Sequence, residues 1–232
     1  MARGSQGRSH RARRRPAARR RPAARGRSPR EQLLSPGWPV ELRHGAVGVR
    51  PLRRRDARTW ARLRGENAEW LGPWEATLPR EAGQPATSYV GMISTLRRRA
   101  RHGQAMPFVV TWNGEMVGLL TVNGITWGSA RWASMGYWVA RSHAGRGVTP
   151  TAVALVTDHL LTTTGLHRVE IAIRPENAAS LRVVEKLGFT EIGTAPRFLH
   201  IAGDWRDHRV FQVVAEDVMD GLVSRLGPVP PG

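Results

Sequence analysis

The fold of this chain is decided by the stretch Tyr137-Trp138-Val139-Ala140-Arg141-Ser142-His143-Ala144-Gly145-Arg146-Gly147-Val148-Thr149. A strand pattern runs into a turn with two glycines, and a helix pattern opens directly after it. Such a turn leaves backbone N–H groups free beside the positive end of the helix dipole, where a pyrophosphate binds. Gly145 and Gly147 let the backbone approach the phosphates closely. A Gly-x-Gly turn alone is a weak signal, because plain turn geometry also explains it.

The segments on both sides of this turn predict a mixed α/β sheet. Before it, strand patterns flank the hairpin turn Asn113-Gly114, and after it strands and helices alternate, as in a crossover unit. The predicted strands are 47–52, 108–112, 116–122, 131–139, 169–173, 189–192 and 210–214. The predicted helices are 56–69 with Asp56 as N-cap, 87–102, 149–163, 177–187 and 216–226, with a loop over 71–86.

Length and composition bound the class of protein. The 232 residues, of which 41% are hydrophobic, fit one globular domain with some extra chain. No stretch approaches the roughly 18 apolar residues of a membrane span, and no secretory signal pattern follows the basic amino terminus. The absence of cysteine excludes disulfides, thiolate metal sites and a cysteine nucleophile, and the eight histidines show no metal-ligand spacing. We expect a cytoplasmic protein that binds no metal and no membrane.

The amino-terminal segment differs from the rest of the chain. Residues 1–30 hold twelve arginines and no acidic residue, with the repeated unit Arg-Arg-Arg-Pro-Ala-Ala. We predict a disordered, basic Arg/Pro/Ala-rich extension over 1–38, because this composition cannot bury enough apolar surface to fold. The folded domain is predicted over 40–226. Residues 1–30 are either an electrostatic arm for RNA or the ribosome, or a functionless upstream extension.

The Gly-x-Gly turn and the segment from Asn177 to Phe189 together resemble the GNAT N-acetyltransferases, and within them the RimJ/RimL type that acetylates ribosomal-protein N-termini. The resemblance covers about residues 45–217. It implies the GNAT fold, which is a mixed, mostly antiparallel sheet flanked by helices, and acetyl-CoA as the acetyl donor. The residues it assigns to the cofactor are Trp138, Val139, Ala144, Gly145, Arg146, Gly147, Val148, Thr149 and Asn177. Gly136 fits the bulge that splays this strand from the next.

The resemblance also implies catalytic residues. Asn177 and Ser180 face the cofactor in the family, and Ser180 is expected to donate a hydrogen bond to the CoA thiolate. Related enzymes that use a tyrosine for this purpose carry it where this chain has Val184. The usual positions of the general base hold Ala172 and Leu199, so Glu170, on the same strand face as Ala172, becomes a candidate that acts through a water. Alternatively, Glu170 forms an ion pair with Arg168.

The loop that holds Trp74 and Glu75 fits the substrate side of the subgroup. Glu75 is expected to bind the substrate N-terminus and is a second candidate for the base. His143 is a candidate for a supporting role at the turn, while His200 and His208 are expected to be structural. Three functions stay open: acetylation of a protein N-terminus, acetylation of a small-molecule amine, and non-catalytic binding of RNA or the ribosome. Acidic enrichment of the acceptor groove would favour the small-molecule amine.

Overall fold

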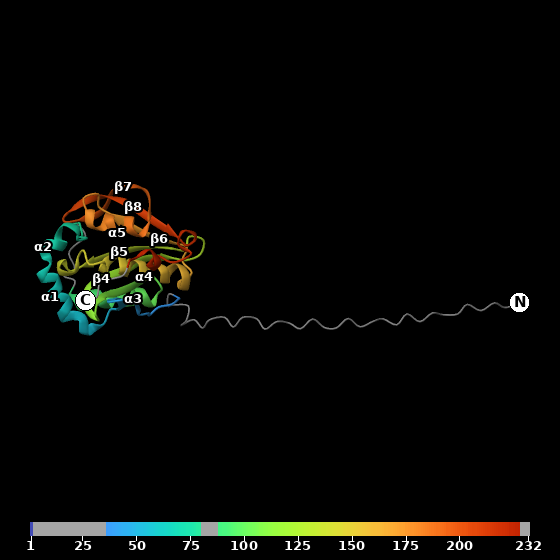
Figure 1. Ribbon diagram of the computed structural model, residues 1–232, viewed down its shortest axis with the longest axis horizontal. Helices are drawn as coiled ribbons and strands as arrows, with labels where there is room; N and C mark the ends of the chain where they lie inside the picture. Colours follow the sequence, from blue (N-terminus) through green and yellow to red (C-terminus); the bar gives the residue numbers. More distant parts are fainter. Residues whose placement is uncertain (2–35, 80–87, 228–232) are drawn as a thin grey trace.

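The computed structural model describes residues 1, 36–79 and 88–227, which fold around one eight-stranded sheet (Figure 1). The strand order is β1-β2-β3-β4-β5-β6-β8-β7. All neighbouring strands are antiparallel except β5 and β6, which are parallel and joined through a helix. The strands are β1 (Leu42–His44), β2 (Val47–Pro51), β3 (Ala105–Trp112), β4 (Glu115–Thr126), β5 (Trp132–Val139), β6 (Arg168–Ile173), β7 (Thr190–Ile201) and β8 (Asp204–Val214). The predicted mixed, mostly antiparallel sheet is confirmed.

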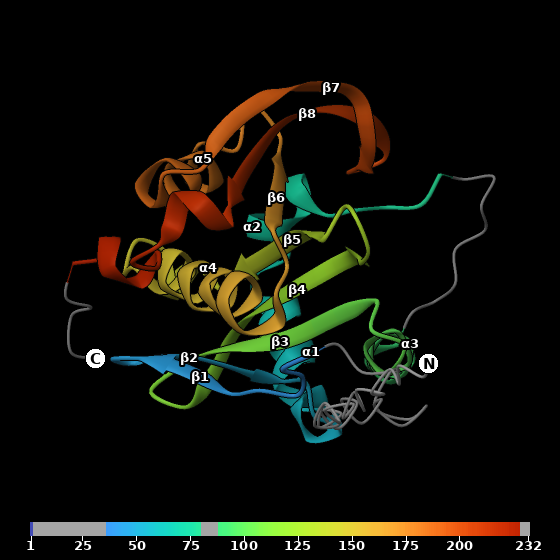
Figure 2. The ribbon, with the colours of Figure 1, turned by 90° about the vertical axis from the view of Figure 1, so that its right-hand side faces the viewer.

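Helices cover both faces of the sheet (Figure 2). One face carries α1 (Ala57–Glu66), the short α2 (Ala68–Leu71) and α3 (Tyr89–Arg101). The other carries α4 (Val148–Asp158) and α5 (Ala178–Leu187). Two of these helices begin at a side-chain cap, since Ser88 accepts a hydrogen bond from the N–H of Gly91 and Asn177 accepts one from the N–H of Ser180. None of the described helices is long and apolar enough to cross a membrane.

The hydrophobic core has two layers, one on each face of the sheet. On the α4 side, Phe108 and Leu120 pack with Val153 and other buried side chains. On the α3 side, Val109 packs with Ile93 in a smaller cluster. Adjacent residues of a strand point to opposite faces, so Phe108 and Val109 join different layers. β3 therefore lies at the centre of the domain, and all eight of its residues are buried.

β5 and β6 separate soon after they begin. Their pairing runs only from Trp132 opposite Arg168 to Ser134 opposite Glu170. Gly136 lies just beyond this point, but it pairs with Thr121 of β4 in regular register. The predicted separation of the two strands is therefore present, while the prediction of a bulge at Gly136 is wrong. The register shift of β4 and β5 falls instead between Asn123 and Thr126.

Two local predictions in the helical regions differ from the structure. The helix predicted over 216–226 is two 3-10 turns, because Gly221 takes a positive φ and the Asp158 carboxylate accepts hydrogen bonds from the N–H groups of Leu222 and Val223. Asp56 does not cap α1 with its side chain. Its carboxylate is buried and accepts two hydrogen bonds of 2.9 Å from the Arg50 guanidinium, which compensate its charge.

The hairpin of β7 and β8 and the ends of the domain also differ from the prediction. The two strands run well beyond the predicted residues and turn at Ala202 and Gly203, both at positive φ. Residues 2–35, which include most of the predicted disordered extension, and residues 80–86 of the predicted loop lie outside the described residues. Trp38 was predicted to belong to the extension, but it packs edge-on against Phe108 at 4.9 Å between ring centroids.

Candidate active site

A cleft of about 1040 Å³ opens where β5 and β6 separate, and it brings most of the predicted cofactor residues together. Residues from α1, α2, the loop over 74–76, β5, the Gly-x-Gly turn, the first turn of α4 and successive turns of α5 line it. The predicted residues in this lining are Trp138, Val139, Ala144, Gly145, Gly147, Val148, Thr149, Asn177 and Ser180. Arg146 alone among the predicted cofactor residues is not part of it.

The Gly-x-Gly turn presents unused backbone donors to this cleft. Gly145 and Gly147 have φ values of 76° and 79°, and the space where a Cβ would project is open at both. Among the described residues, none accepts a hydrogen bond from the N–H groups of residues 145–147. The N–H groups of Val148 and Thr149 lie in the first turn of α4, where an α-helix offers no partner. This arrangement suits a pyrophosphate.

Asn67 and Trp70 tie the start of the turn to α1 and α2. The Asn67 side chain is buried, accepts a hydrogen bond from the N–H of Arg141 at 2.8 Å and donates one to the carbonyl of Leu63. Trp70 donates its indole N–H to the carbonyl of Val139 at 3.1 Å. Sequence reasoning missed Asn67, because its partner lies 74 residues away and no local motif marks it.

The side of the cleft that holds the predicted substrate residues is aromatic, with one ion pair and two cation–π contacts. Glu75 pairs with Arg64, whose guanidinium lies 5.7 Å from the centre of the Trp138 ring. Trp74 lies under the guanidinium of Arg174 at 5.5 Å. The hairpin tip fixes this loop, because Ala202 donates its N–H to the Glu75 carbonyl at 3.0 Å. Both predicted substrate residues therefore line the cleft.

Comparison with known proteins identifies the family. The model of the acetyltransferase (GNAT) domain matches residues 47–190, which is more than half of the chain. The chain belongs to the GNAT acetyltransferase family. It is an N-acetyltransferase, and the turn and helix that carried the resemblance lie within the matched residues.

Several proteins similar to this GNAT enzyme are named as acetyltransferases of ribosomal proteins. The structure of Mycobacterium smegmatis RimJ in complex with CoA-disulfide is 41% identical, with a TM-score of 0.76 over 83% of this chain and 96% of that one. The Escherichia coli [ribosomal protein uS5]-alanine N-acetyltransferase is 27% identical over 78% of this chain and 94% of its own. A ribosomal-protein-S5-alanine acetyltransferase structure from Vibrio fischeri is 27% identical, with a TM-score of 0.68 over 77% and 98%.

The structure does not bring Glu170 to the cleft of this GNAT enzyme. Glu170 is not among the lining residues, and its carboxylate pairs with Arg168 at 2.5 Å. The structure therefore shows the ion pair of the alternative interpretation, and a role of Glu170 as a base acting through a water stays a prediction. Glu176 does line the cleft, although sequence reasoning missed it, and it pairs with Arg174 at 3.1 Å.

Tyr137 is a further residue of the cleft that sequence reasoning missed. It lies on β5, lines the cleft and packs toward the α4 side of the sheet, where α5 carries Ser180. Its hydroxyl is buried and has no hydrogen-bond partner among the described residues. Burial raises the pKa of Tyr137, and the nearby Ser180 hydroxyl offsets only part of this rise. The only signal in the sequence was its place in the strand before the turn.

The three histidines singled out in the sequence lie outside the cleft lining. Burial, together with the charge of Arg146, lowers the pKa of His143. The His143 ring therefore adds little positive charge beside the turn at neutral pH. The ring of His200 forms a hydrogen bond with the Thr77 hydroxyl at 2.7 Å. His208 is buried, and its Nδ1 donates a hydrogen bond to the Arg206 carbonyl at 3.0 Å. Both contacts are consistent with the structural role predicted for these histidines.

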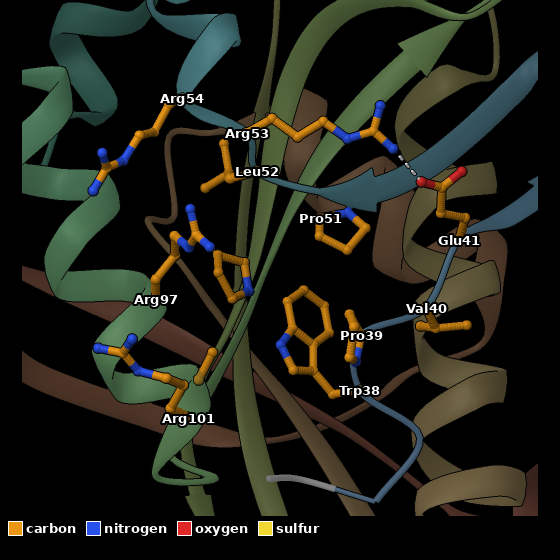
Figure 3. Close-up of a pocket in the computed structure, with 12 residues that line it drawn as sticks. Trp38, Pro39, Val40, Glu41, Pro51, Leu52, Arg53, Arg54, Arg97 and Arg101 are labelled. Carbon is orange, nitrogen blue, oxygen red and sulfur yellow. Dashed lines mark hydrogen bonds and ion pairs between the residues drawn. The ribbon is translucent and has the colours of Figure 1, made fainter.

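A second cavity, of about 670 Å³, lies away from these residues (Figure 3). Trp38 and Pro51 contribute to its apolar walls, and Arg97 and Arg101 come from the end of α3. Arg53, which also lines it, pairs with Glu41 at 2.5 Å. None of the predicted cofactor, catalytic or substrate residues lines this cavity.

Proposed function

We propose that this GNAT enzyme transfers the acetyl group of acetyl-CoA to the α-amine of a protein N-terminus. The bound CoA-disulfide of the RimJ structure supports the donor, and the name of the [ribosomal protein uS5]-alanine N-acetyltransferase supports a protein acceptor. The carrying observation is the cleft itself, which joins a turn with unused N–H donors to an aromatic groove holding Glu75. Acetyl-CoA supplies an activated acyl group as a thioester. A ribosomal protein is the acceptor that the relatives' names favour.

The donor half of the cleft fits a pyrophosphate. Gly145 and Gly147 have no side chain that would fill the space in front of the turn, and their N–H groups are unused. Arg182 and Lys186 project from successive turns of α5 into the same cleft. We assign them to the negative charges of the donor, since a CoA molecule carries several phosphate groups.

The acceptor half must bind an amine and remove a proton from it. The neutral nitrogen attacks the thioester carbonyl carbon, the carbon–sulfur bond breaks, and sulfur leaves with the bonding electron pair. We assign the amine and its proton to Glu75, because this carboxylate lines the cleft while Glu170 does not. The backbone bond from Ala202 holds Glu75 in place during the reaction.

Asn177 and Ser180 keep the roles that the resemblance implied, with one refinement. The Asn177 side-chain oxygen is engaged in capping α5 through the N–H of Ser180 at 3.1 Å. Its remaining amide N–H groups are therefore the part available to a ligand. The Ser180 hydroxyl faces the cleft from the first turn of α5 and is assigned as a hydrogen-bond donor to the leaving sulfur.

The charge of the cleft bears on the nature of the acceptor. Its charged lining residues are Arg64, Glu75, Glu176, Arg182 and Lys186, so acidic side chains are not in excess. Both carboxylates also pair with an arginine. A site for polycationic small molecules would need more acidic groups. A protein N-terminus, which brings a single amine and a peptide backbone, fits this balance better.

The direct test is mass spectrometry of N-terminal peptides incubated with the enzyme and acetyl-CoA. Peptides that start with alanine or serine should gain one acetyl group on the α-amine, while the same peptides with a blocked N-terminus should not. Polyamines serve as the competing acceptors. Acetylation of polyamines alone would replace the proposed acceptor class. Salt-dependent RNA binding with no acetyl transfer would favour the non-catalytic alternative.

A further inference from the structure

The hydroxyl of Tyr137 is an unexplained polar group in the wall of the cleft. Tyr137 lies next to Trp138 on β5, two residues before Val139 and the end of the strand. Its side chain packs against the core layer that includes Val183 and Val184 of α5. The hydroxyl oxygen is buried and finds no hydrogen-bond partner among the described residues.

A hydroxyl without a partner costs stability unless a ligand completes it. Buried polar groups are almost always hydrogen-bonded, and an unpaired one loses its hydration without compensation. A phenylalanine at this position would avoid the cost, because it has the same ring without the oxygen. The position of the oxygen at the cleft indicates that its partner is a bound molecule.

The neighbours of Tyr137 identify the part of the ligand that it meets. Ser180, the residue assigned to the leaving sulfur, is close enough to affect the Tyr137 hydroxyl, although the two hydroxyls are not in hydrogen-bonding geometry. The place of the tyrosine used by related enzymes holds Val184, which contacts the same core layer as the Tyr137 ring. The Tyr137 ring thus packs from the sheet side against the core layer to which α5 contributes.

We propose that the Tyr137 hydroxyl donates a hydrogen bond to the sulfur of CoA as the carbon–sulfur bond breaks. Nitrogen bonds to the carbonyl carbon, sulfur takes the bonding pair as a thiolate, and Tyr137 stabilises that charge without giving up its proton. Glu75 receives the proton of the amine, and the thiolate takes a proton from water after release. Burial raises the pKa of Tyr137, so its hydroxyl stays protonated and acts as a donor throughout.

This inference rests on the proposed function, because it places a residue at the sulfur of the proposed donor. The test is Tyr137→Phe, which removes one oxygen atom. Tyr89→Phe is the matched control, since Tyr89 is the other tyrosine of the chain, and its hydroxyl donates to the Arg53 carbonyl at 3.1 Å outside the cleft lining. Three measurements are compared: the melting temperature without ligand, acetyl transfer to a peptide, and binding of CoA and desulfo-CoA.

The two variants should behave in opposite ways. Tyr137→Phe should keep or raise the melting temperature and lower kcat by about 10- to 100-fold, the usual effect of removing a donor to a developing charge. Tyr89→Phe should lower the melting temperature and leave kcat unchanged, since it breaks a hydrogen bond that the folded protein uses. This contrast separates a catalytic role of Tyr137 from a structural one.

Ligand binding gives a readout that does not depend on turnover. At about pH 10.5, well above the pKa of an alkyl thiol, the thiol of CoA is largely ionised, whereas desulfo-CoA has no sulfur. Tyr137→Phe should weaken CoA about tenfold at this pH and leave desulfo-CoA unchanged. Equal affinity of wild type and Tyr137→Phe for CoA would overturn the proposal. A wild-type chain that binds neither compound would instead overturn the proposed function.

Ser180→Ala distinguishes direct contact from an effect passed through Ser180. If both hydroxyls meet the sulfur, Tyr137→Phe should still weaken CoA relative to desulfo-CoA when Ser180 is already alanine. If the effect of Tyr137→Phe disappears in the Ser180→Ala background, Tyr137 only positions Ser180, and the proposed contact with sulfur is wrong.

Discussion

The side-chain oxygen of Asn67 accepts a hydrogen bond from the backbone N–H of Arg141 at 2.8 Å. Asn67 lies between α1 and α2 on one face of the sheet, while Arg141 begins the segment that leads to the Gly-x-Gly turn. The same side chain donates to the carbonyl of Leu63, so it is held at both ends. Through this buried amide, the helices of the acceptor side fix the turn of the donor side.

Asn67→Ala should loosen the turn and weaken binding of CoA. The free energy of unfolding should fall by about 1–2 kcal/mol, because the N–H of Arg141 loses its partner, whereas the Leu63 carbonyl keeps the backbone N–H of residue 67. Calorimetric titration with CoA and a thermal melt measure the two effects. Asn123→Ala is the control, since that side chain bonds to Arg99 and Thr121 away from the turn. Unchanged CoA affinity in Asn67→Ala would show that the turn holds its shape alone.

Gly147→Val should block the approach of phosphate to the turn. Gly147 has a φ of 79°, and a Cβ placed there would project into open space in the cleft. Gly128→Val is a matched control, because Gly128 has a φ of 77° and equally open space outside the cleft lining. In both variants the left-handed backbone should lower the free energy of unfolding by about 1–2 kcal/mol. Only Gly147→Val should lose the stabilisation that acetyl-CoA gives in a thermal melt.

Glu75→Gln should impair the acceptor half of the reaction and spare the donor half. Its carboxylate is the group assigned to the amine and its proton, so kcat/KM for a peptide should fall by about 100-fold or more. Affinity for CoA, measured by titration, should stay within about twofold. Glu191→Gln provides the comparison, since Glu191 also pairs with an arginine, Arg209, but lies outside the cleft lining. Full activity of Glu75→Gln would show that a different group accepts the proton of the amine.

The domain should lose stability as the pH falls below about 6.5. Burial lowers the pKa of His159 despite its hydrogen bond to the Gly37 carbonyl, and burial also lowers the pKa of His208. The unfolded chain therefore binds more protons than the folded one below the ordinary histidine pKa. Each histidine costs up to about 1.4 kcal/mol per pH unit in this window. His159→Gln, which can still donate to Gly37, should show a shallower fall of melting temperature between pH 7 and 5.5.

Removal of residues 1–34 should separate polyanion binding from catalysis. This segment carries twelve arginines, so its loss should abolish most non-specific RNA affinity and flatten the dependence of that affinity on salt. All residues assigned to the cleft lie after residue 40, so turnover of a free peptide should stay nearly unchanged in a chain that starts at Ser35. Loss of peptide turnover in this folded shorter chain would show that the extension contributes to the active site.

The sequence alone determined the parts of the molecule that depend on neighbouring residues. Gly145 and Gly147 indicated the turn, because glycine adopts a positive φ more readily than other residues. Asn177 and Gly188 indicated the two ends of α5, because an asparagine side chain caps a helix start and a glycine adopts the left-handed conformation that ends a helix. Together they indicated the crossover unit, the position of the cofactor turn and the family.

Other features failed because distant residues decide them. The terminal helix pattern is broken by hydrogen bonds from Leu222 and Val223 to Asp158, which lies on another helix. Asp56 had the residue type of an N-cap, but the burial of Arg50 beside it made an ion pair the better use of its carboxylate.

Only the tertiary structure decided which side chains face the cleft. Glu170 and Glu75 are both candidates for the base in the sequence, yet packing turns Glu170 toward Arg168 and the hairpin tip fixes Glu75 at the groove. Tyr137 and Asn67 likewise have functions set by partners on other elements. Local backbone geometry follows from residue type along the chain, whereas the burial and pairing of a side chain depend on elements that meet only after folding.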